Sequence, residues 1–154
     1  MKKVFASLHA RAICHATEEL ERVEETIRAV IGDADLHVSR TEGVHGNEID
    51  VVQAEVDDGR AIIAFFDRLS TEALRKVAET LEQRIDEERN MFIRIEKQLA
   101  LAGDIRLSTG DDVVSVRLRV RSFPAKKEAA VRVVRQFLTE LIAAREADEK
   151  ARNG

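Results

Sequence analysis

A strict alternation of apolar and polar residues is the most constraining feature of this sequence. In SVRLRVRS, residues 115–122, the apolar Val116, Leu118 and Val120 alternate with three arginines. Successive side chains of a strand point to opposite faces, so this period of two predicts a strand with one buried and one exposed face. Pro124 cannot donate a hydrogen bond to a neighbouring strand and is expected to prevent continuation.

Two other segments share this alternation. In residues 3–15, one phase holds Val4, Ala6, Leu8, Ala10 and Ala12, and the other holds Lys3, Phe5, Ser7, His9 and Arg11. After residue 90, Met91, Ile93 and Ile95 alternate with Phe92, Arg94 and Glu96. We expect both segments to be strands that bury their aliphatic phase.

A hairpin is predicted over residues 36–57, with its turn in TEGVHGN, residues 41–47. Val52, Ala54 and Val56 share one face of its second strand. A glycine tolerates the positive φ that such turns require, so either Gly43 or Gly46 is expected to adopt it.

Apolar residues spaced three and four apart predict the helices. The first helix is expected to begin after Thr17 as its N-cap and to end at Gly32. Two more helices are expected over residues 59–69 and 71–87, the second capped by Ser70. A long last helix should follow Pro124.

This order of elements predicts an α+β fold with a largely antiparallel sheet, helices on one face and one open face. We expect a single domain over residues 1–144 and a charged C-terminal tail, residues 145–154, that frays. A chain of 154 residues is long enough to bury a substantial core.

The sequence offers no continuous apolar run of the kind that a signal peptide or membrane helix needs. Its single cysteine, Cys14, excludes an intramolecular disulfide and falls in the buried phase of its strand, where an inert thiol is expected. These features favour a cytoplasmic protein with no membrane partner.

Charge is distributed unevenly along the chain. The net charge is −4, but residues 113–137 contain seven basic residues and one acid, which gives that segment +6 and leaves −10 for the rest. A local concentration of charge influences the choice of partner more than the total does.

Basic and aromatic residues would therefore gather on the open face if the strands form one sheet. Guanidinium groups bind phosphates and stack on bases, and exposed phenylalanines provide stacking surfaces for unpaired bases. The candidate RNA-binding residues are Arg117, Arg119, Arg121, Lys126, Lys127, Arg94, Lys97, Arg132, Arg135, Phe5, Phe92 and Arg11. The other interpretation, that the arginines only solvate a sheet face, is less favoured because neighbouring like charges repel one another.

Catalytic and metal-binding signals are weak. His9, His15, His37 and His45 are scattered without metal-ligand spacing, and GDD at 110–112 is typical of a turn. We therefore predict no catalytic residue, no metal and no cofactor. A hydrolase that uses His45, Asp111 and Asp112 is kept as a minor alternative.

Four segments carry a resemblance to a known family. They are HATEELERV (15–23), TEGVHGNEI (41–49), IRIEKQLALAG (93–103) and DDVVSVRLRVRSFPAKKE (111–128). In order and spacing they are similar to the archaeal family of RNA-binding proteins and predicted exosome subunits, and the likeness extends to about Leu141. The matching motifs are His45–Asn47, Lys97–Gln98 with Gly103, and Asp111–Asp112. Glu96 and Ala102 depart from the family pattern, which often has another acid and a tyrosine at these places.

The resemblance implies a fold similar to that of the ribosomal protein that binds 5S rRNA, and an exosome-type assembly as a partner. Together with the basic segment, it predicts a non-catalytic RNA-binding protein that is an accessory factor in RNA processing or degradation. The alternative is an interaction subunit, whose basic face docks an acidic protein or pairs with a second copy in a homodimer.

Overall fold

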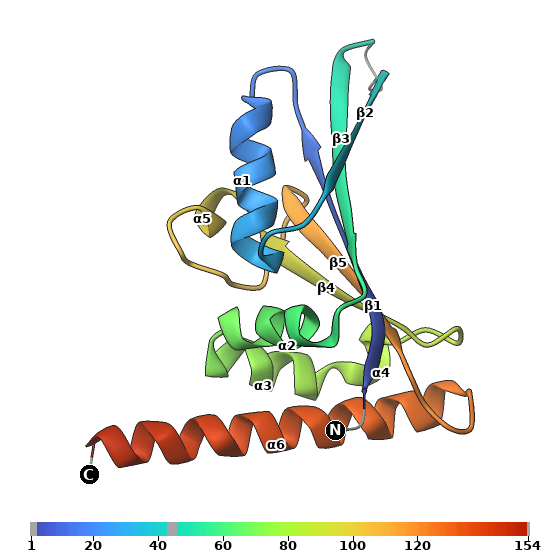
Figure 1. Cartoon of the computed structure of the whole chain (residues 1–154), viewed down its shortest axis with the longest axis vertical. Coiled ribbons are helices and arrows are strands. Elements are labelled where there is room, and N and C mark those ends of the chain that lie inside the picture. Colours follow the sequence, from blue (N-terminus) through green and yellow to red (C-terminus); the bar gives the residue numbers. More distant parts are fainter. Residues whose placement is uncertain (1–2, 43–45, 154) are drawn as a thin grey trace.

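The computed structural model describes residues 3–42 and 46–153, and in these ranges five strands form one antiparallel sheet (Figure 1). The strands are β1 (Phe5–Cys14), β2 (Leu36–Glu42), β3 (Glu48–Val56), β4 (Asn90–Glu96) and β5 (Val113–Val120). Their order across the sheet is β2-β3-β1-β5-β4, so β1 and β5 are central neighbours.

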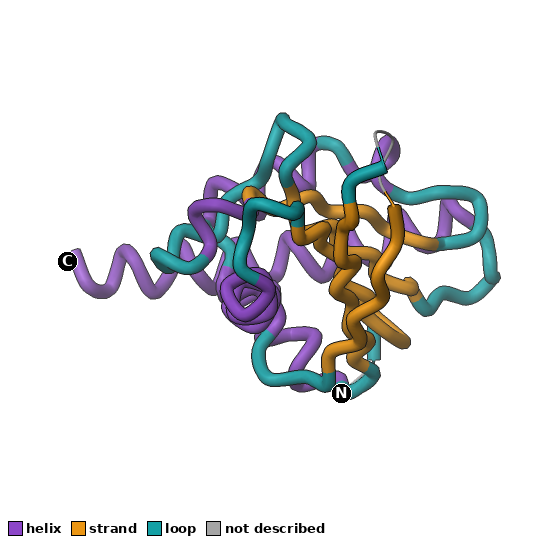
Figure 2. The backbone as a smooth tube through the Cα atoms, turned by 90° about the horizontal axis from the view of Figure 1, so that it is seen from above, coloured by secondary structure: helices purple, strands orange, loops and turns teal. Residues whose placement is uncertain are grey.

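Six helices complete the described ranges: α1 (Leu20–Ile31), α2 (Gly59–Arg68), α3 (Thr71–Glu79), α4 (Leu81–Arg84), α5 (Lys97–Ala100) and α6 (Lys127–Asn153). Figure 1 shows α1 standing beside one face of the sheet, with α2 below it on the same side, and Figure 2 shows from above that helices lie beside the strands. The aliphatic phases of β1, β4 and β5 are buried there, as at Leu8, Ile93 and Val116. The predicted α+β fold with one open face is confirmed.

Phe5 does not lie on the open face as the alternation predicted. Phe5 pairs with Val120 and Ser7 with Arg119, so β1 has one extra residue between these two pairs. Such a bulge reverses the phase of the strand, and Phe5 joins the buried side with an exposure of 2%. Its ring stacks on Phe66 and meets Phe137 edge to face, with centroids 5.1 and 5.4 Å away.

The helix boundaries agree with the sequence in part. Gly32 ends α1 with φ 87°, and the Ser70 hydroxyl accepts a hydrogen bond from the Ala73 backbone N–H at 3.0 Å, both as predicted. Thr17 does not cap α1, which begins at Leu20 with Glu19 in the N-cap position. The helix predicted over residues 71–87 is interrupted at Thr80, whose hydroxyl donates to the Lys76 carbonyl and accepts from Arg84.

The hairpin is confirmed as β2 and β3, and Gly46 has the expected positive φ, 76°. Gly43 and His45 lie outside the described residues.

α6 continues as a helix through the charged C-terminal tail to Asn153. The Arg145 guanidinium donates to the backbone carbonyls of Phe66 and Leu69 at the end of α2. Arg75 donates to Glu146 at 2.6 Å, close to the tail's start.

Within the part of the chain that the structure describes, no helix combines the length and the apolar character needed to cross a membrane.

Candidate nucleic-acid interface

Four of the candidate arginines share the open face of β1, β5 and β4. Across these strands the pairing places Arg117 between His9 and Phe92. One row away, Arg119 lies between Ser7 and Asn90. On the other side of Arg117, Ser115 lies between Arg11 and Arg94. The register therefore brings residues from three distant segments into one compact group.

The charges of this group are largely uncompensated. In residues 3–42 and 46–153, no acidic side chain forms an ion pair with Arg11, Arg117 or Arg119. Arg94 is the exception, since it donates to the Gly110 carbonyl at 2.9 Å and lies 3.7 Å from Asp111. Phe92 is 44% exposed beside Arg117, so an aromatic surface borders the cationic one.

The basic surface continues beyond the end of β5. The Arg121 backbone N–H donates to the Val4 carbonyl at 2.8 Å, which keeps the chain beside β1 for one more residue. Arg121 and Lys126 are exposed, and Lys127 begins α6. Figure 1 shows the start of α6 extending past the sheet on the side away from α1.

Arg132 and Arg135 are exposed on α6, a separate element from the sheet. Phe137, on the same helix, packs against Phe5 at the start of β1. The first half of α6 therefore crosses the end of the sheet at which β5 also ends.

Lys97 is not part of this exposed surface, contrary to the sequence prediction. Lys97 follows Met91, Ile93 and Ile95 in the buried phase of β4, so at the first residue of α5 its side chain still points inward and is 3% exposed. Its ammonium donates at 2.8 Å to the Ile13 carbonyl and the Glu18 carboxylate, and it lies 2.8 Å from Asp112.

Gln98 completes this arrangement by donating to Asp112 at 2.6 Å. We call Lys97, Glu18, Asp112 and Gln98 the Lys97 network. It ties the start of α1, the end of β4 and the start of β5 together, so these residues of the KQ and DD motifs have a structural role.

The network shifts the pKa values of its members. Burial, the largest single cause, would raise the pKa of Glu18 and Asp112, but the hydrogen bonds from Lys97 and Gln98 together with the charge of Lys97 and, at Glu18, a bond from the His15 backbone lower both. Burial would lower the pKa of Lys97, but hydrogen bonds to Asp112 and Glu18 raise it above its ordinary value.

The acids of this network also resemble metal ligands. Single ligand atoms of His15, Glu18 and Asp112 lie within 4.8 Å of one another. Lys97, however, lies 2.8 Å from both carboxylates and already supplies a positive charge between them. We therefore assign this group to the fold rather than to an ion.

The Asp111–Asp112 pair is divided between two environments. Asp112 is bound by Lys97 and Gln98, whereas Asp111 is fully exposed. Because His45 lies outside the described residues, the structure offers no geometry for the hydrolase alternative.

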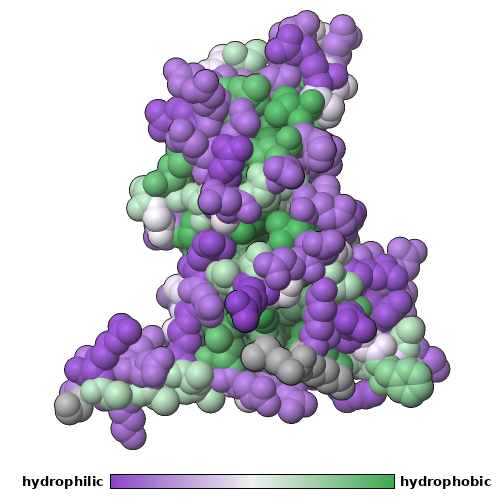
Figure 3. Space-filling model, viewed as in Figure 1, coloured by the Kyte–Doolittle hydropathy of each residue, from purple (hydrophilic) through white to green (hydrophobic). Residues whose placement is uncertain are grey.

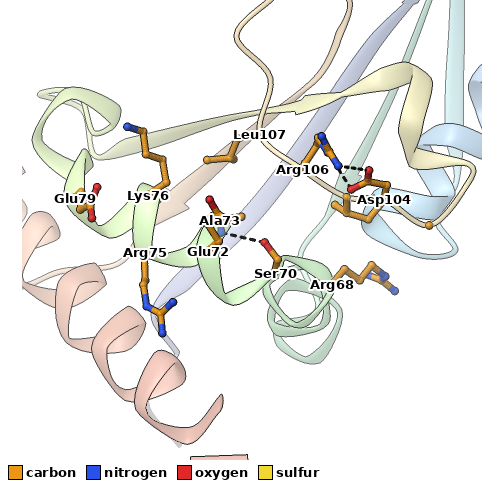
Figure 4. Close-up of a pocket in the computed structure, with 12 residues that line it drawn as sticks. Arg68, Ser70, Glu72, Ala73, Arg75, Lys76, Glu79, Asp104, Arg106 and Leu107 are labelled. Carbon is orange, nitrogen blue, oxygen red and sulfur yellow. Dashed lines mark hydrogen bonds and ion pairs between the residues drawn. The ribbon is translucent and has the colours of Figure 1, made fainter. Parts of the chain in front are cut away.

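A separate hollow lies away from this surface. A cleft of about 870 Å³ lies between α3 and residues 103–107 (Figure 4). Basic and acidic side chains alternate around it, and Arg106 already pairs with Asp104 at 2.6 Å. Because its charges are mixed, the cleft has no electrostatic preference for a polyanion.

Hydrophobic side chains in the view of Figure 3 lie in small areas separated by hydrophilic ones.

Sequence reasoning missed one residue next to the basic surface. Phe123, in the loop between β5 and α6, is 97% exposed, the largest value among the exposed large apolar side chains of the described chain. The signal was a phenylalanine in a polar loop, placed two residues after Arg121.

Comparison with known proteins gives consistent results. A family model described as RNA binding matches residues 7–120. The RNA-binding protein PAB1135 of Pyrococcus abyssi is 37% identical over 142 residues, which cover 86% of this chain and 92% of that protein. Protein MJ0213 of Methanocaldococcus jannaschii is 29% identical over 140 residues, 83% of this chain and 93% of that one. Among solved structures, the DUF54 protein Mth689 of Methanothermobacter thermautotrophicus superposes with a TM-score of 0.79 at 34% identity, covering 88% of this chain and 98% of that one.

Proposed function

Since the chain belongs to the RNA-binding family, we propose that it binds RNA through the open face of its sheet and is a non-catalytic accessory factor in RNA processing or degradation. The observation that most directly supports this proposal is the group of unpaired arginines that the strand register brings together on β1 and β5. Unpaired cations on one face repel one another, and a bound phosphate backbone would relieve that repulsion.

The chemistry of the group suits RNA in two ways. Guanidinium groups bind phosphate oxygens with two parallel hydrogen bonds and also stack on bases. Phe92 beside Arg117 adds an aromatic face for an unpaired base. Single-stranded binding sites combine these two elements, so we propose unpaired RNA as the ligand.

Residues beyond the sheet extend the proposed contact. Arg121, Lys126 and Lys127 follow the arginines along the chain, and Arg132 and Arg135 add charge on α6. Two exposed acids, Glu87 and Glu88, precede β4, and neither forms an ion pair in the described part of the chain.

The proposal is tested by changing Arg117, Arg119 and Arg121 together to glutamine and titrating a single-stranded RNA at several salt concentrations. Each phosphate contact contributes about −0.7 to the slope of log affinity against log salt. We expect weaker binding and a slope that is flatter by about 2 if all three contacts are lost.

A matched control removes the same charge elsewhere. Arg40, Arg75 and Arg106 each form an ion pair away from the open face, so their triple glutamine variant should keep the parent's slope. Unchanged affinity and slope in the Arg117 variant would contradict the proposal. A change of oligomeric state without a change in RNA binding would instead favour the interaction subunit.

A further inference from the structure

Phe123 is unlike the other phenylalanines of the chain. Phe5, Phe65 and Phe66 are buried, Phe137 packs against the core, and Phe92 lies half exposed on the sheet. Phe123 alone among the six leaves nearly its whole ring in water, at 97% exposure. At that exposure, packing within the protein does not account for its presence.

The loop that carries Phe123 is held by hydrogen bonds on both sides. Before it, the Arg121 N–H donates to the Val4 carbonyl at 2.8 Å. After it, the Pro124 carbonyl accepts from the Ser122 hydroxyl at 3.0 Å and from the Lys126 N–H at 2.9 Å. A ring presented by a loop that is already ordered loses less entropy on binding.

The chain carries exposed cations on both sides of Phe123. Arg121 lies two residues before it and Lys126 three residues after it, and both are exposed. Neither forms an ion pair in residues 3–42 and 46–153. A protein-docking anchor usually lies within an apolar patch, whereas an isolated ring between cations matches a polyanion that also has aromatic faces.

From these observations we infer that Phe123 stacks on an unpaired nucleobase of bound RNA while Arg121 and Lys126 contact the phosphates that flank it. The inference rests on the proposed function and adds a second stacking point beyond the sheet. It assigns the loop between β5 and α6 to the recognition of single-stranded rather than fully paired RNA, because paired bases hide their faces.

The experiment measures the affinity of Phe123→Ala for two RNAs, a single strand and a fully paired duplex of the same length, at one fixed salt concentration. Alanine substitution of a stacking aromatic costs about 1–3 kcal/mol per base, so single-strand binding should weaken roughly 5- to 150-fold. Duplex affinity and the salt slope should stay within twofold of the parent values. A 2-aminopurine base in the single strand should be quenched by the parent and less by the variant.

Two further variants identify the kind of contact. Phe123→Trp keeps an aromatic ring and should retain the parent affinity, whereas Phe123→Leu keeps apolar bulk without the ring and should bind as weakly as Phe123→Ala. Val38→Ala removes another exposed apolar side chain, 44% exposed on the hairpin, and should have no effect.

The outcomes separate this inference from the proposal on which it rests. Suppose that the parent binds RNA and that binding is lost when Arg117, Arg119 and Arg121 are replaced by glutamine. If Phe123→Ala or Phe123→Leu then binds RNA like the parent, only the role of Phe123 is overturned. Equal losses for single strand and duplex would also overturn it. If the parent binds neither RNA, the proposed function fails as well. Since the ring is exposed, all Phe123 variants should melt like the parent.

Discussion

The Lys97 network and the arginine row, which consists of Arg117, Arg119 and Arg121, use cationic side chains in opposite ways. Lys97 is buried and reaches two carboxylates and a carbonyl at 2.8 Å. The row is exposed or half-buried and has no ion pair within the described ranges. A cation that is fully coordinated contributes to folding, whereas one without a partner remains available to a ligand.

This difference predicts separable effects. Variants of the network should lower the stability of the fold and leave the salt dependence of RNA binding intact in the folded fraction. Variants of the arginine row should change the salt dependence of RNA binding and leave the stability of the fold intact. The largest expected effect is on stability.

Replacing Lys97 with methionine should destabilise the protein by about 3 kcal/mol. The apolar side chain keeps the bulk but leaves Glu18 and Asp112 close together without their common cation. Urea denaturation would measure the loss, with Lys76→Met as the control at an exposed lysine. Adding Glu18→Gln and Asp112→Asn should restore part of the stability. A Lys97→Met midpoint equal to that of the parent would show that the network is not a stabilising element.

The same network should make stability depend on pH at both extremes. The carboxyl pKa values are lowered from ordinary values of 4.5 and 3.8, so this contribution is present above pH 4.5 and is lost as pH falls through the folded values. The pKa of Lys97 is raised from 10.5, so its contribution is present below pH 10.5 and is lost as pH rises above the folded value.

The comparison is made between the parent and the Glu18→Gln, Asp112→Asn variant. Their free energies of unfolding should differ most between pH 5 and 10 and converge toward pH 3. A difference that stays constant down to pH 3 would contradict the assigned ion pairs.

The two regions also differ in how far the sequence predicted them. Period two placed Arg117 and Arg119 correctly, because a strand's alternation is a local property that residues 115–122 display clearly. Arg11, Phe92 and Arg94 were likewise assigned to the open face. Whether these side chains lie beside Arg117 depends on how β1, β5 and β4 pair. The sequence predicted that pairing only on the assumption that the strands form one sheet.

Phe5 and Lys97 were misplaced for different reasons. A bulge shifts β1 by one residue at Phe5, whereas Lys97 continues the buried phase of Met91, Ile93 and Ile95 and was assigned to the surface because of its charge. Strict alternation at the start of β1 would have buried Ala6 and exposed a phenylalanine, and that imbalance was a usable signal. The partners of Lys97 lie 79 residues and 15 residues away, at Glu18 and Asp112, beyond the reach of local patterns.

The smallest expected effect comes from changing the row's side chains while keeping their charge. Lysine in place of Arg117, Arg119 and Arg121 preserves the attraction to phosphate, so the salt slope should equal that of the parent. It removes the planar group that stacks on bases, which is worth about 0.5–1 kcal/mol at an exposed site, or a two- to fivefold loss per stacking contact. The loss should appear with single-stranded RNA and be smaller with a duplex, so discrimination between the two should narrow. Equal losses of affinity and slope in the lysine and glutamine variants would mean that the row acts through geometry rather than charge, and the contrast with Lys97 would then no longer hold.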